Sequence, residues 1–337
     1  MADLVSLDEV RAAARRIAGV AVRTPLLPFH PAPLPLLVKP ESLQPTGAFK
    51  LRGAYNAVYA VTRGLDSCAL PAGVVAHSSG NHGFAVAYAA RLLGVNAAIV
   101  VPENAPAVKT DAIERAGAEL VRVEPTLVAR IAATDEIARV RGYHPVAPFD
   151  DRDVIAGQGT VGLEIAEDTA SRPPAAVLVP VGGGGLISGT AVAVKALLPG
   201  TRVIGVEPAL AADARESLHT GTRVRWAPAD TARTRADALR VEQVGELTFP
   251  HIQAYVDDIV TVSEDELLET VRLLAVRARL VAEPGGAVAV AAALFRDPAE
   301  LGLAASAASA QLVAVLSGGN IDTAVLAEIL RTSSYTG

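Results

Sequence analysis

One lysine in the segment QPTGAFKLRGA, residues 44–54, could carry out chemistry that an arginine cannot. Arginine stays protonated in proteins, whereas a buried lysine can lose its proton and act as a nucleophile or a base. Lys50 stands between the apolar residues Phe49 and Leu51, at the start of an apolar helical run. We therefore expect a desolvated ammonium group that is prepared for Schiff-base chemistry, with a solvated surface lysine as the alternative. Only four of the 30 basic residues are lysines, namely Lys39, Lys50, Lys109 and Lys195.

A second segment with chemical potential is PVGGGGLISG, residues 180–189, which joins an apolar strand to a helix. Successive backbone N–H groups in such a turn form a nest that fits a phosphate group. The segment lacks the G-x-G-x-x-G register of a dinucleotide site and the lysine of a P-loop. A tight turn is the alternative, but four consecutive glycines favour a phosphate site.

Two polar turns complete the set. In HSSGNHG, residues 77–83, small residues let backbone amides approach an anion at a helix N-terminus, and Asn81 and His82 add side-chain donors. In LSGGNID, residues 316–322, Ser317 ends an apolar strand and can present its hydroxyl group to a ligand. Helix capping by serine is the alternative in both segments. Ligands of open α/β sheets bind at the carboxyl ends of strands, where these turns are expected.

A desolvated lysine, a phosphate cradle and an anion-binding loop together meet the requirements of pyridoxal 5'-phosphate, which needs a lysine, a phosphate socket and a partner for its ring nitrogen. Other chemistries are disfavoured. The six histidines do not have zinc-ligand spacing, and the chain has no G-x-S-x-G nucleophile elbow.

The elements that must position these residues alternate between strand and helix. From residue 74 to residue 207, β-branched runs of strand length alternate with amphipathic or apolar helical segments, and glycines follow several of the helices as C-terminal caps. Two further helices are predicted from capping boxes, Ser6 with Glu9 and Ser263 with Glu266. This alternation is typical of parallel sheets with right-handed crossovers, and so of an α/β fold.

We expect two open parallel-sheet α/β domains, the smaller inserted in the larger. Residues 1–51 and 151–337 would form the large cofactor-binding domain, and residues 52–150 the small domain that carries the substrate loop.

Composition restricts the class of protein. The net charge of −6 provides no basic surface for nucleic acid. A single cysteine, Cys68, excludes internal disulfides and suggests a reducing, cytoplasmic location. The N-terminal segment has no signal-peptide pattern, and glycines and prolines interrupt the uncharged stretch 173–194, so we expect no membrane span.

In this order the motifs resemble those of the fold type II pyridoxal-phosphate enzymes, specifically the serine/threonine dehydratase and serine racemase family. The matching segments cover nearly the whole chain: RTPLL at 23–27, ESLQPTGAFKLRGA at 41–54, SSGNHG at 78–83, VIAGQGT at 154–160, VPVGGGG at 179–185, VEP at 206–208, VDDIVTVSEDE at 256–266, EPGGA at 283–287 and LSGGNID at 316–322.

The resemblance implies a role for each site residue. Lys50 would bind the cofactor, and Ser79 would face it across the cofactor, where a racemase needs a second proton donor. Other cofactor contacts would come from Phe49, Asn81, Gly182, Gly183, Gly184, Gly185, Leu186, Glu283 and Ser317. The substrate carboxylate would be bound by the loop of Ser78, Ser79, Gly80, Asn81 and His82.

The resemblance also implies a divalent-cation site made by Glu207, the Ala211 carbonyl and Asp213. Hard oxygen ligands suit Mg²⁺ or Ca²⁺. A solvated acidic loop is the alternative.

The resemblance implies a dehydratase, or ammonia-lyase, that removes water and ammonia from L-threonine or L-serine to give a 2-keto acid. The alternatives are an amino-acid racemase, a 3-hydroxyaspartate ammonia-lyase and, from another class, a non-catalytic ligand sensor. The expected partners are a small amino-acid substrate and a second copy of the chain in a homodimer. β-Replacement is disfavoured, because enzymes of that type typically have the sequence Lys-Asp-Arg at the cofactor lysine, whereas this chain has Lys-Leu-Arg at residues 50–52.

Three positions depart from the family pattern. Ala238 stands where the family usually has glycine, and its methyl group is expected to narrow the pocket. Gly285 stands where alanine or threonine is commoner. Arg235 replaces an apolar residue, and it would bind a second substrate carboxylate if it faced inward or be a surface charge if it faced outward.

Overall fold

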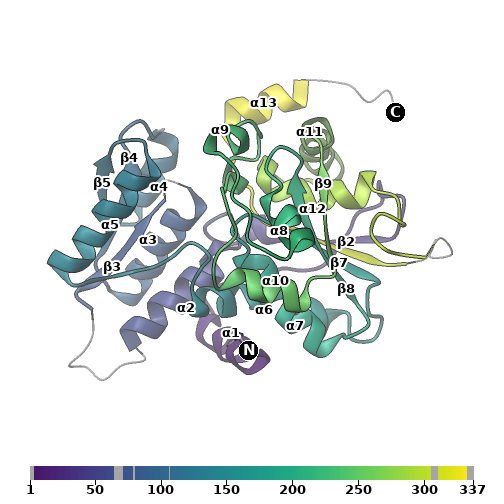
Figure 1. Cartoon of the computed structure of the whole chain (residues 1–337), viewed down its shortest axis with the longest axis horizontal. Helices are drawn as coiled ribbons and strands as arrows, with labels where there is room; N and C mark the ends of the chain where they lie inside the picture. The colour runs from purple at the N-terminus through teal and green to yellow at the C-terminus, as the bar shows by residue number, and fades with distance from the viewer. Residues whose placement is uncertain (1–3, 64–70, 79, 106, 305–309, 332–337) are drawn as a thin grey trace.

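The computed structural model describes residues 4–63, 71–78, 80–105, 107–304 and 310–331. Figure 1 shows two sheets, the smaller at the left of the view and the larger at the right. The larger sheet has the strand order β1 (Leu27–Pro28), β2 (Leu36–Pro40), β10 (Leu312–Leu316), β7 (Ala176–Pro180), β8 (Arg202–Pro208) and β9 (Asp258–Val262). Its strands pair in parallel, except for β1, which lies antiparallel at the edge.

The smaller sheet has the order β5 (Glu119–Val123), β4 (Ala97–Pro102), β3 (Gly73–His77) and β6 (Tyr143–Pro145), and all its pairs are parallel. The prediction of an α/β fold with parallel sheets is therefore confirmed. The domain bounds at residues 51 and 150 stay a prediction.

Helices cover both faces of the larger sheet, which is why β7 and β10 are buried along their whole length and consist of apolar residues. One face packs against α11 (Glu264–Leu273) and α12 (Pro284–Phe295). The other packs against α6 (Arg152–Asp168), α7 (Gly185–Leu197) and α10 (Thr248–Tyr255).

The smaller sheet is covered in the same way. One face packs against α2 (Lys50–Arg63), α3 (Asn81–Leu93) and α4 (Ala107–Arg115), and the other against α5 (Leu127–Arg141). Helix α2 also packs against α6, so it connects the two sheets (Figure 1).

The remaining elements are short or peripheral. They are α1 (Leu7–Ile17), α8 (Asp213–Thr220), α9 (Pro228–Thr231), α13 (Thr323–Arg331), the 3₁₀ turns η1 (Glu41–Leu43) and η3 (Asp237–Leu239), and the π-helical turn η4 (Leu274–Ala278). No helix in the described part of the chain combines the length and the apolar character needed to cross a membrane.

The capping signals were accurate. Both predicted capping boxes form, at Ser6 and at Ser263. Gly94 and Gly142 end their helices in the left-handed conformation. Helix α7 has its C-cap at Leu198. The next residue is proline, which disfavours the helical conformation in the residue before it.

Candidate active site

Lys50 is the first residue of α2 and lies beside the carboxyl end of β10. The amide of Phe49 donates a hydrogen bond of 3.0 Å to the carbonyl of Ser317, and Ala48 forms a β-bridge with Gly318. Gly47 has a φ of 72°, and a Cβ there would come within 2.2 Å of the Asn320 side chain. The turn before Lys50 is thus fixed against the LSGGNID segment, as the prediction of one common site requires.

The Lys50 side chain has a polar contact with backbone and an apolar neighbour. Its Nζ donates to the carbonyl of Pro148 at 2.5 Å and lies 5.2 Å from the centre of the Phe49 ring. Burial lowers its pKa to about 8. A much larger fraction of this amine is therefore neutral at physiological pH than for an ordinary lysine, and the neutral form is the nucleophile and the base.

Two asparagines and a glutamate join the two sheets near Lys50. The Nδ2 of Asn81, at the start of α3, donates to Glu283 Oε1 at 2.6 Å. The Nδ2 of Asn320 donates in turn to Asn81 Oδ1 at 2.7 Å. Sequence reasoning anticipated Asn81 and Glu283 through the family resemblance but missed Asn320, although this residue lies three positions after Ser317.

The glycine loop follows β7 and requires its glycines. Gly184 has a φ of 93°, and a Cβ on Gly183 would come within 2.2 Å of the Phe149 ring. The Thr248 hydroxyl donates to the Gly183 carbonyl at 2.7 Å. Since α7 begins at Gly185 without a side-chain cap, its first amides remain available to bind an anion.

Ser317 and Glu283 lie at neighbouring positions, and both side chains are almost fully buried. The Ser317 amide donates to the carbonyl of Gly286 at 3.2 Å, and the Glu283 amide donates to the carbonyl of Gly318 at 3.1 Å. The end of β10 is therefore held to the first turn of α12.

The predicted substrate loop forms the N-terminus of α3, which also has no side-chain cap. The Gly80 amide donates to Ser78 Oγ at 3.2 Å. His82 Nε2 is 2.9 Å from the carbonyl of Val146, so this nitrogen carries the proton and donates inward. Burial, followed by the charge of Lys50, lowers the pKa of His82 to about 3, and the ring stays neutral. Ser79 lies outside the described residues, and its role stays a prediction.

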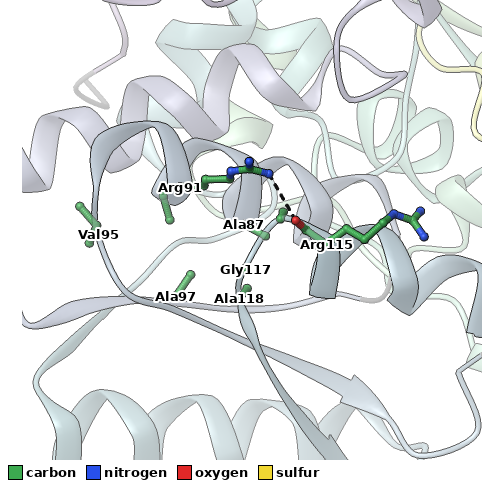
Figure 2. Close-up of a pocket in the computed structure, with 9 residues that line it drawn as sticks. Ala87, Arg91, Val95, Ala97, Arg115, Gly117 and Ala118 are labelled. Carbon is green, nitrogen blue, oxygen red and sulfur yellow. Dashed lines mark hydrogen bonds between the residues drawn. The ribbon is translucent and has the colours of Figure 1, made fainter.

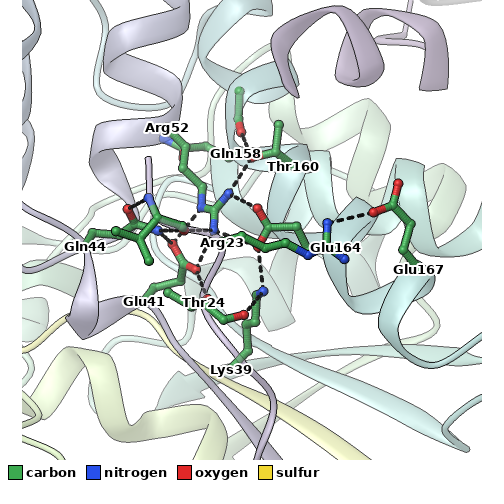
Figure 3. A network of polar contacts seen from close by, with 12 residues as sticks. Arg23, Thr24, Lys39, Glu41, Gln44, Arg52, Gln158, Thr160, Glu164 and Glu167 are labelled. Carbon is green, nitrogen blue, oxygen red and sulfur yellow. Dashed lines mark hydrogen bonds and ion pairs between the residues drawn. The ribbon is translucent and has the colours of Figure 1, made fainter. Parts of the chain in front are cut away.

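A largely buried polar network surrounds Arg52, which lies on the same helix as Lys50 (Figure 3). The Arg52 guanidinium donates to both carboxylate oxygens of Glu41 at 2.7 and 2.8 Å and to both of Glu164 at 2.7 and 2.9 Å. The buried Lys39 ammonium donates to Glu164 Oε2 at 2.6 Å and to the carbonyl of Thr24 at 2.6 Å. Burial alone would raise the pKa of Glu41, but the Arg52 charge holds it below its usual value. Sequence reasoning missed this network.

The predicted cation site contains two buried carboxyl groups. Glu207 is the last residue but one of β8 and accepts from the amides of Ala214 at 3.1 Å and Arg215 at 2.8 Å. Asp213 begins α8, and its Oδ2 is buried without a hydrogen-bond partner. Burial raises the pKa of both groups, that of Asp213 to about 7, and the proximity of Asp213 raises that of Glu207 further. A cation would relieve both effects, so the donor set fits Mg²⁺ or Ca²⁺.

No three His, Cys, Asp or Glu side chains in the described ranges cluster tightly enough to hold a metal alone. Backbone carbonyls or water would have to complete the coordination of a cation at Glu207 and Asp213.

A cavity of about 270 Å³, shown in Figure 2, lies elsewhere. It is lined by Arg91 and Arg115 and by small residues that precede β4 and β5, and Arg91 donates to the Arg115 carbonyl at 3.3 Å. It therefore opens at the amino ends of these strands, whereas Lys50 and the polar turns lie at carboxyl ends. The candidate active site is therefore formed by the side chains that converge around Lys50, and this cavity is separate from it.

Arg235 faces outward. Its side chain is exposed and lies 3.6 Å from Glu328, and its amide donates to Glu264. The inward alternative, in which Arg235 binds a second substrate carboxylate, is wrong.

Comparison with known proteins agrees with this geometry. The profile of the family described as "Pyridoxal-phosphate dependent enzyme" matches residues 17–318. The serine racemase of Dictyostelium discoideum is 38% identical over 334 residues, which cover 97% of this chain and 98% of the relative. An L-threo-3-hydroxyaspartate ammonia-lyase of a Pseudomonas species is 38% identical over 332 residues, covering 97% and 99%. The crystal structure of a threonine deaminase from the organism abbreviated T.th. superposes with a TM-score of 0.85 and 45% identity, covering 94% of this chain and 99% of that one.

Proposed function

This chain belongs to the pyridoxal-phosphate dependent enzymes, and we propose that it removes water and ammonia from an L-β-hydroxy amino acid, L-threonine or L-serine, to leave a 2-keto acid. The observation that carries the proposal is the position of Lys50, whose pKa burial lowers to about 8. Its Nζ donates to the carbonyl of Pro148, the residue before the Phe149 ring that lies against the glycine loop, and its charge acts on His82 at the start of α3. When bound, the cofactor supplies a sink for the negative charge that develops at the α carbon.

Lys50 has two tasks in this proposal. Its amine would hold the cofactor, and when free it would take the proton from the α carbon of the substrate. Both tasks need the neutral amine, which a pKa lowered to about 8 makes more abundant than in an ordinary lysine. The carbonyl of Pro148, 2.5 Å away, fixes the position of Nζ without adding a negative charge that would raise this pKa.

Two sets of backbone amides bind the anionic groups. Those at residues 182–186 would hold the phosphate group of the cofactor, and those of Ser78 and residues 80–82 would hold the carboxylate of the substrate. Both sets lie at helix N-termini without side-chain caps, where the helix dipole also favours an anion.

The polar residues around the cofactor ring favour elimination. Asn81 is held from both sides by Glu283 and Asn320 and would orient the ring hydroxyl. Ser317 would meet the ring nitrogen with a neutral hydroxyl group instead of a carboxylate. A neutral partner of this kind would not favour a protonated ring, and the site would therefore favour loss of the β-hydroxyl group.

Release of keto acid and ammonia from purified protein tests the proposal. The protein, supplied with pyridoxal phosphate, is assayed against L-serine, L-threonine and L-threo-3-hydroxyaspartate. Keto acid released from L-serine or L-threonine supports the proposal. Release from L-threo-3-hydroxyaspartate alone would replace it by an L-threo-3-hydroxyaspartate ammonia-lyase activity. Cofactor binding without any keto acid would indicate the ligand sensor.

Racemisation is a second candidate, because a serine racemase is similar over nearly the whole chain. It needs an acid–base group on the face of the substrate opposite Lys50, and Ser79 is the residue assigned to it by resemblance. Ser79→Ala should abolish formation of the D-amino acid while elimination from the L-isomer remains measurable. Chiral analysis of the remaining substrate decides the ranking: wild-type protein that forms D-serine faster than keto acid would be a racemase.

We also propose that Glu207, Asp213 and the Ala211 carbonyl bind Mg²⁺ or Ca²⁺, supported by the unpartnered Oδ2 of Asp213. A homodimer in the cytoplasm completes the proposal. The single cysteine supports a reducing compartment, and light scattering of the purified protein tests the oligomeric state.

A further inference from the structure

The turn η3, Asp237–Leu239, lies between the glycine loop and the first turn of α12. A Cβ on Gly182 would lie 3.3 Å from Leu239 and 3.4 Å from Val241. A Cβ on Gly285 would lie 3.2 Å from the Ala238 methyl carbon and 3.4 Å from Leu239. Since Glu283 begins the same turn of α12 and hydrogen-bonds Asn81, η3 forms one side of the candidate active site.

The backbone of this turn is fixed from behind. The Leu239 amide donates to the Ala236 carbonyl at 2.8 Å, and the Arg240 side chain donates twice to the Thr234 carbonyl, at 2.6 and 3.0 Å. The Thr234 hydroxyl donates to Glu264 at 2.7 Å. These hydrogen bonds resist displacement of the turn when a larger ligand enters.

Ala238 is exposed, whereas Ala236 and Leu239 on either side are buried. Its methyl group therefore faces open space beside Gly285. An added methyl at Gly285 would be 3.2 Å from it, closer than carbon atoms pack comfortably. The two positions are coupled: only one of them can carry a methyl group without a shift of the wall.

We propose that Ala238, together with the missing side chain at Gly285, is a specificity-determining wall of the amino-acid pocket and limits the size of the substrate's β-substituent. The inference rests on the proposed function, because it requires an amino acid bound beside the cofactor. Glycine at position 238 removes a methyl group and enlarges the pocket. Alanine at position 285 then places a methyl group in part of the freed space, from the opposite side.

The test uses amino acids that bind but cannot lose a β-hydroxyl group. Glycine, L-alanine, L-2-aminobutyrate and L-norvaline form a series that grows by one carbon at each step. Their binding to the holoenzyme is followed through the absorbance of the cofactor. The variants are Ala238→Gly, Gly285→Ala and the double variant, with Ala299→Gly as a matched control, an exposed alanine beyond the far end of α12.

Ala238→Gly should raise the affinity for L-norvaline relative to glycine by about tenfold, the lower end of what one or two buried carbons contribute. Gly285→Ala should lower that ratio and the melting temperature, and the double variant should recover both. A change that is equal for all four ligands, or that Ala299→Gly reproduces, would overturn the proposal. A holoenzyme that released no keto acid from serine or threonine would refute the proposed function, yet the ligand series would still decide this inference.

Discussion

Arg52 allows the sharpest quantitative prediction, because it is fully buried and its charge is fully compensated. Its guanidinium makes six hydrogen bonds, two to each carboxylate, one to the Thr160 hydroxyl and one to the Val22 carbonyl. Two cations, Arg52 and Lys39, face two anions, Glu41 and Glu164. Figure 3 shows the four side chains directed at one another.

Arg52→Met keeps much of the length of the side chain but removes its charge and donors. The network then has one surplus negative charge, and Glu41 loses both of its guanidinium bonds while it remains fully buried. Removing one partner of a buried ion pair costs about 3–5 kcal/mol, because the other charge is left uncompensated. A typical domain has roughly 5–15 kcal/mol of total stability, so this is a large fraction.

The assay is urea unfolding followed by circular dichroism, with Arg52→Lys as the matched control. Lysine keeps the charge and loses the bidentate geometry, so its loss of unfolding free energy should be smaller. In the methionine variant Glu41 should also become protonated at a higher pH than in wild type, because the Arg52 charge holds the pKa of Glu41 down.

The sign of the pH dependence follows from linkage. A carboxyl whose pKa is lowered in the folded state stabilises the fold above its ordinary pKa, and this contribution is lost as pH falls through the folded value. The difference between wild type and Arg52→Met should therefore be wide at pH 7 and narrow below about pH 4, near the ordinary glutamate pKa. A difference under about 1 kcal/mol at pH 7, where a buried pair should cost several times more, or one that widens in acid, would refute this account.

Three further predictions concern the site itself. Reaction of the apoprotein with pyridoxal phosphate should speed up with pH, reach half of its maximum rate near pH 8, the Lys50 pKa, and level off above it. Lys50→Ala but not Lys195→Ala should abolish the covalent link that borohydride traps. Chelator should lower the melting temperature more at pH 8 than at pH 5, because Asp213, whose pKa is raised to about 7, destabilises the fold when it ionises without a cation. Asp213→Asn should remove this chelator effect. The fluorescence of the single tryptophan, Trp226, should report cation binding, because its indole donates to Glu216 on α8 at 2.7 Å. Asn320→Ala should weaken cofactor binding about fivefold or more by freeing one side of Asn81, since a neutral hydrogen bond contributes on the order of 1 kcal/mol; unchanged affinity would show that Glu283 alone is sufficient.

Local patterns account for what the sequence predicted well. Buried parallel strands such as 176–180 and 312–316 are continuous apolar runs, and each ends at glycine or serine residues with recognisable chemistry. The glycine loop and the lysine of α2 could be identified for the same reason. Each carries its signature within a few neighbouring residues.

Residues whose role depends on distant partners could not be found in this way. Asn320 contacts Asn81 across 239 positions, and Arg52 contacts Glu164 across 112. Arg52 stands in an apolar helical run, where a single charged residue is usually a solvated one. Only the fold brings its four partners together.

Helix α6 shows how packing overrides local preference. No element was predicted over its 17 residues, 152–168, which include Gly157, Gly159 and Gly162, and each glycine costs a helix roughly 1 kcal/mol relative to alanine. The structure explains them: a Cβ on Gly157 would come within 2.6 Å of the Gly53 Cα, and a Cβ on Gly159 within 2.9 Å of the Gly189 carbonyl. Because Gly53 belongs to the first turn of α2, the close approach of α6 sets where that turn begins, and so where Lys50 is placed. The glycines that weakened the helical pattern are thus the residues that let α6 position the candidate catalytic lysine.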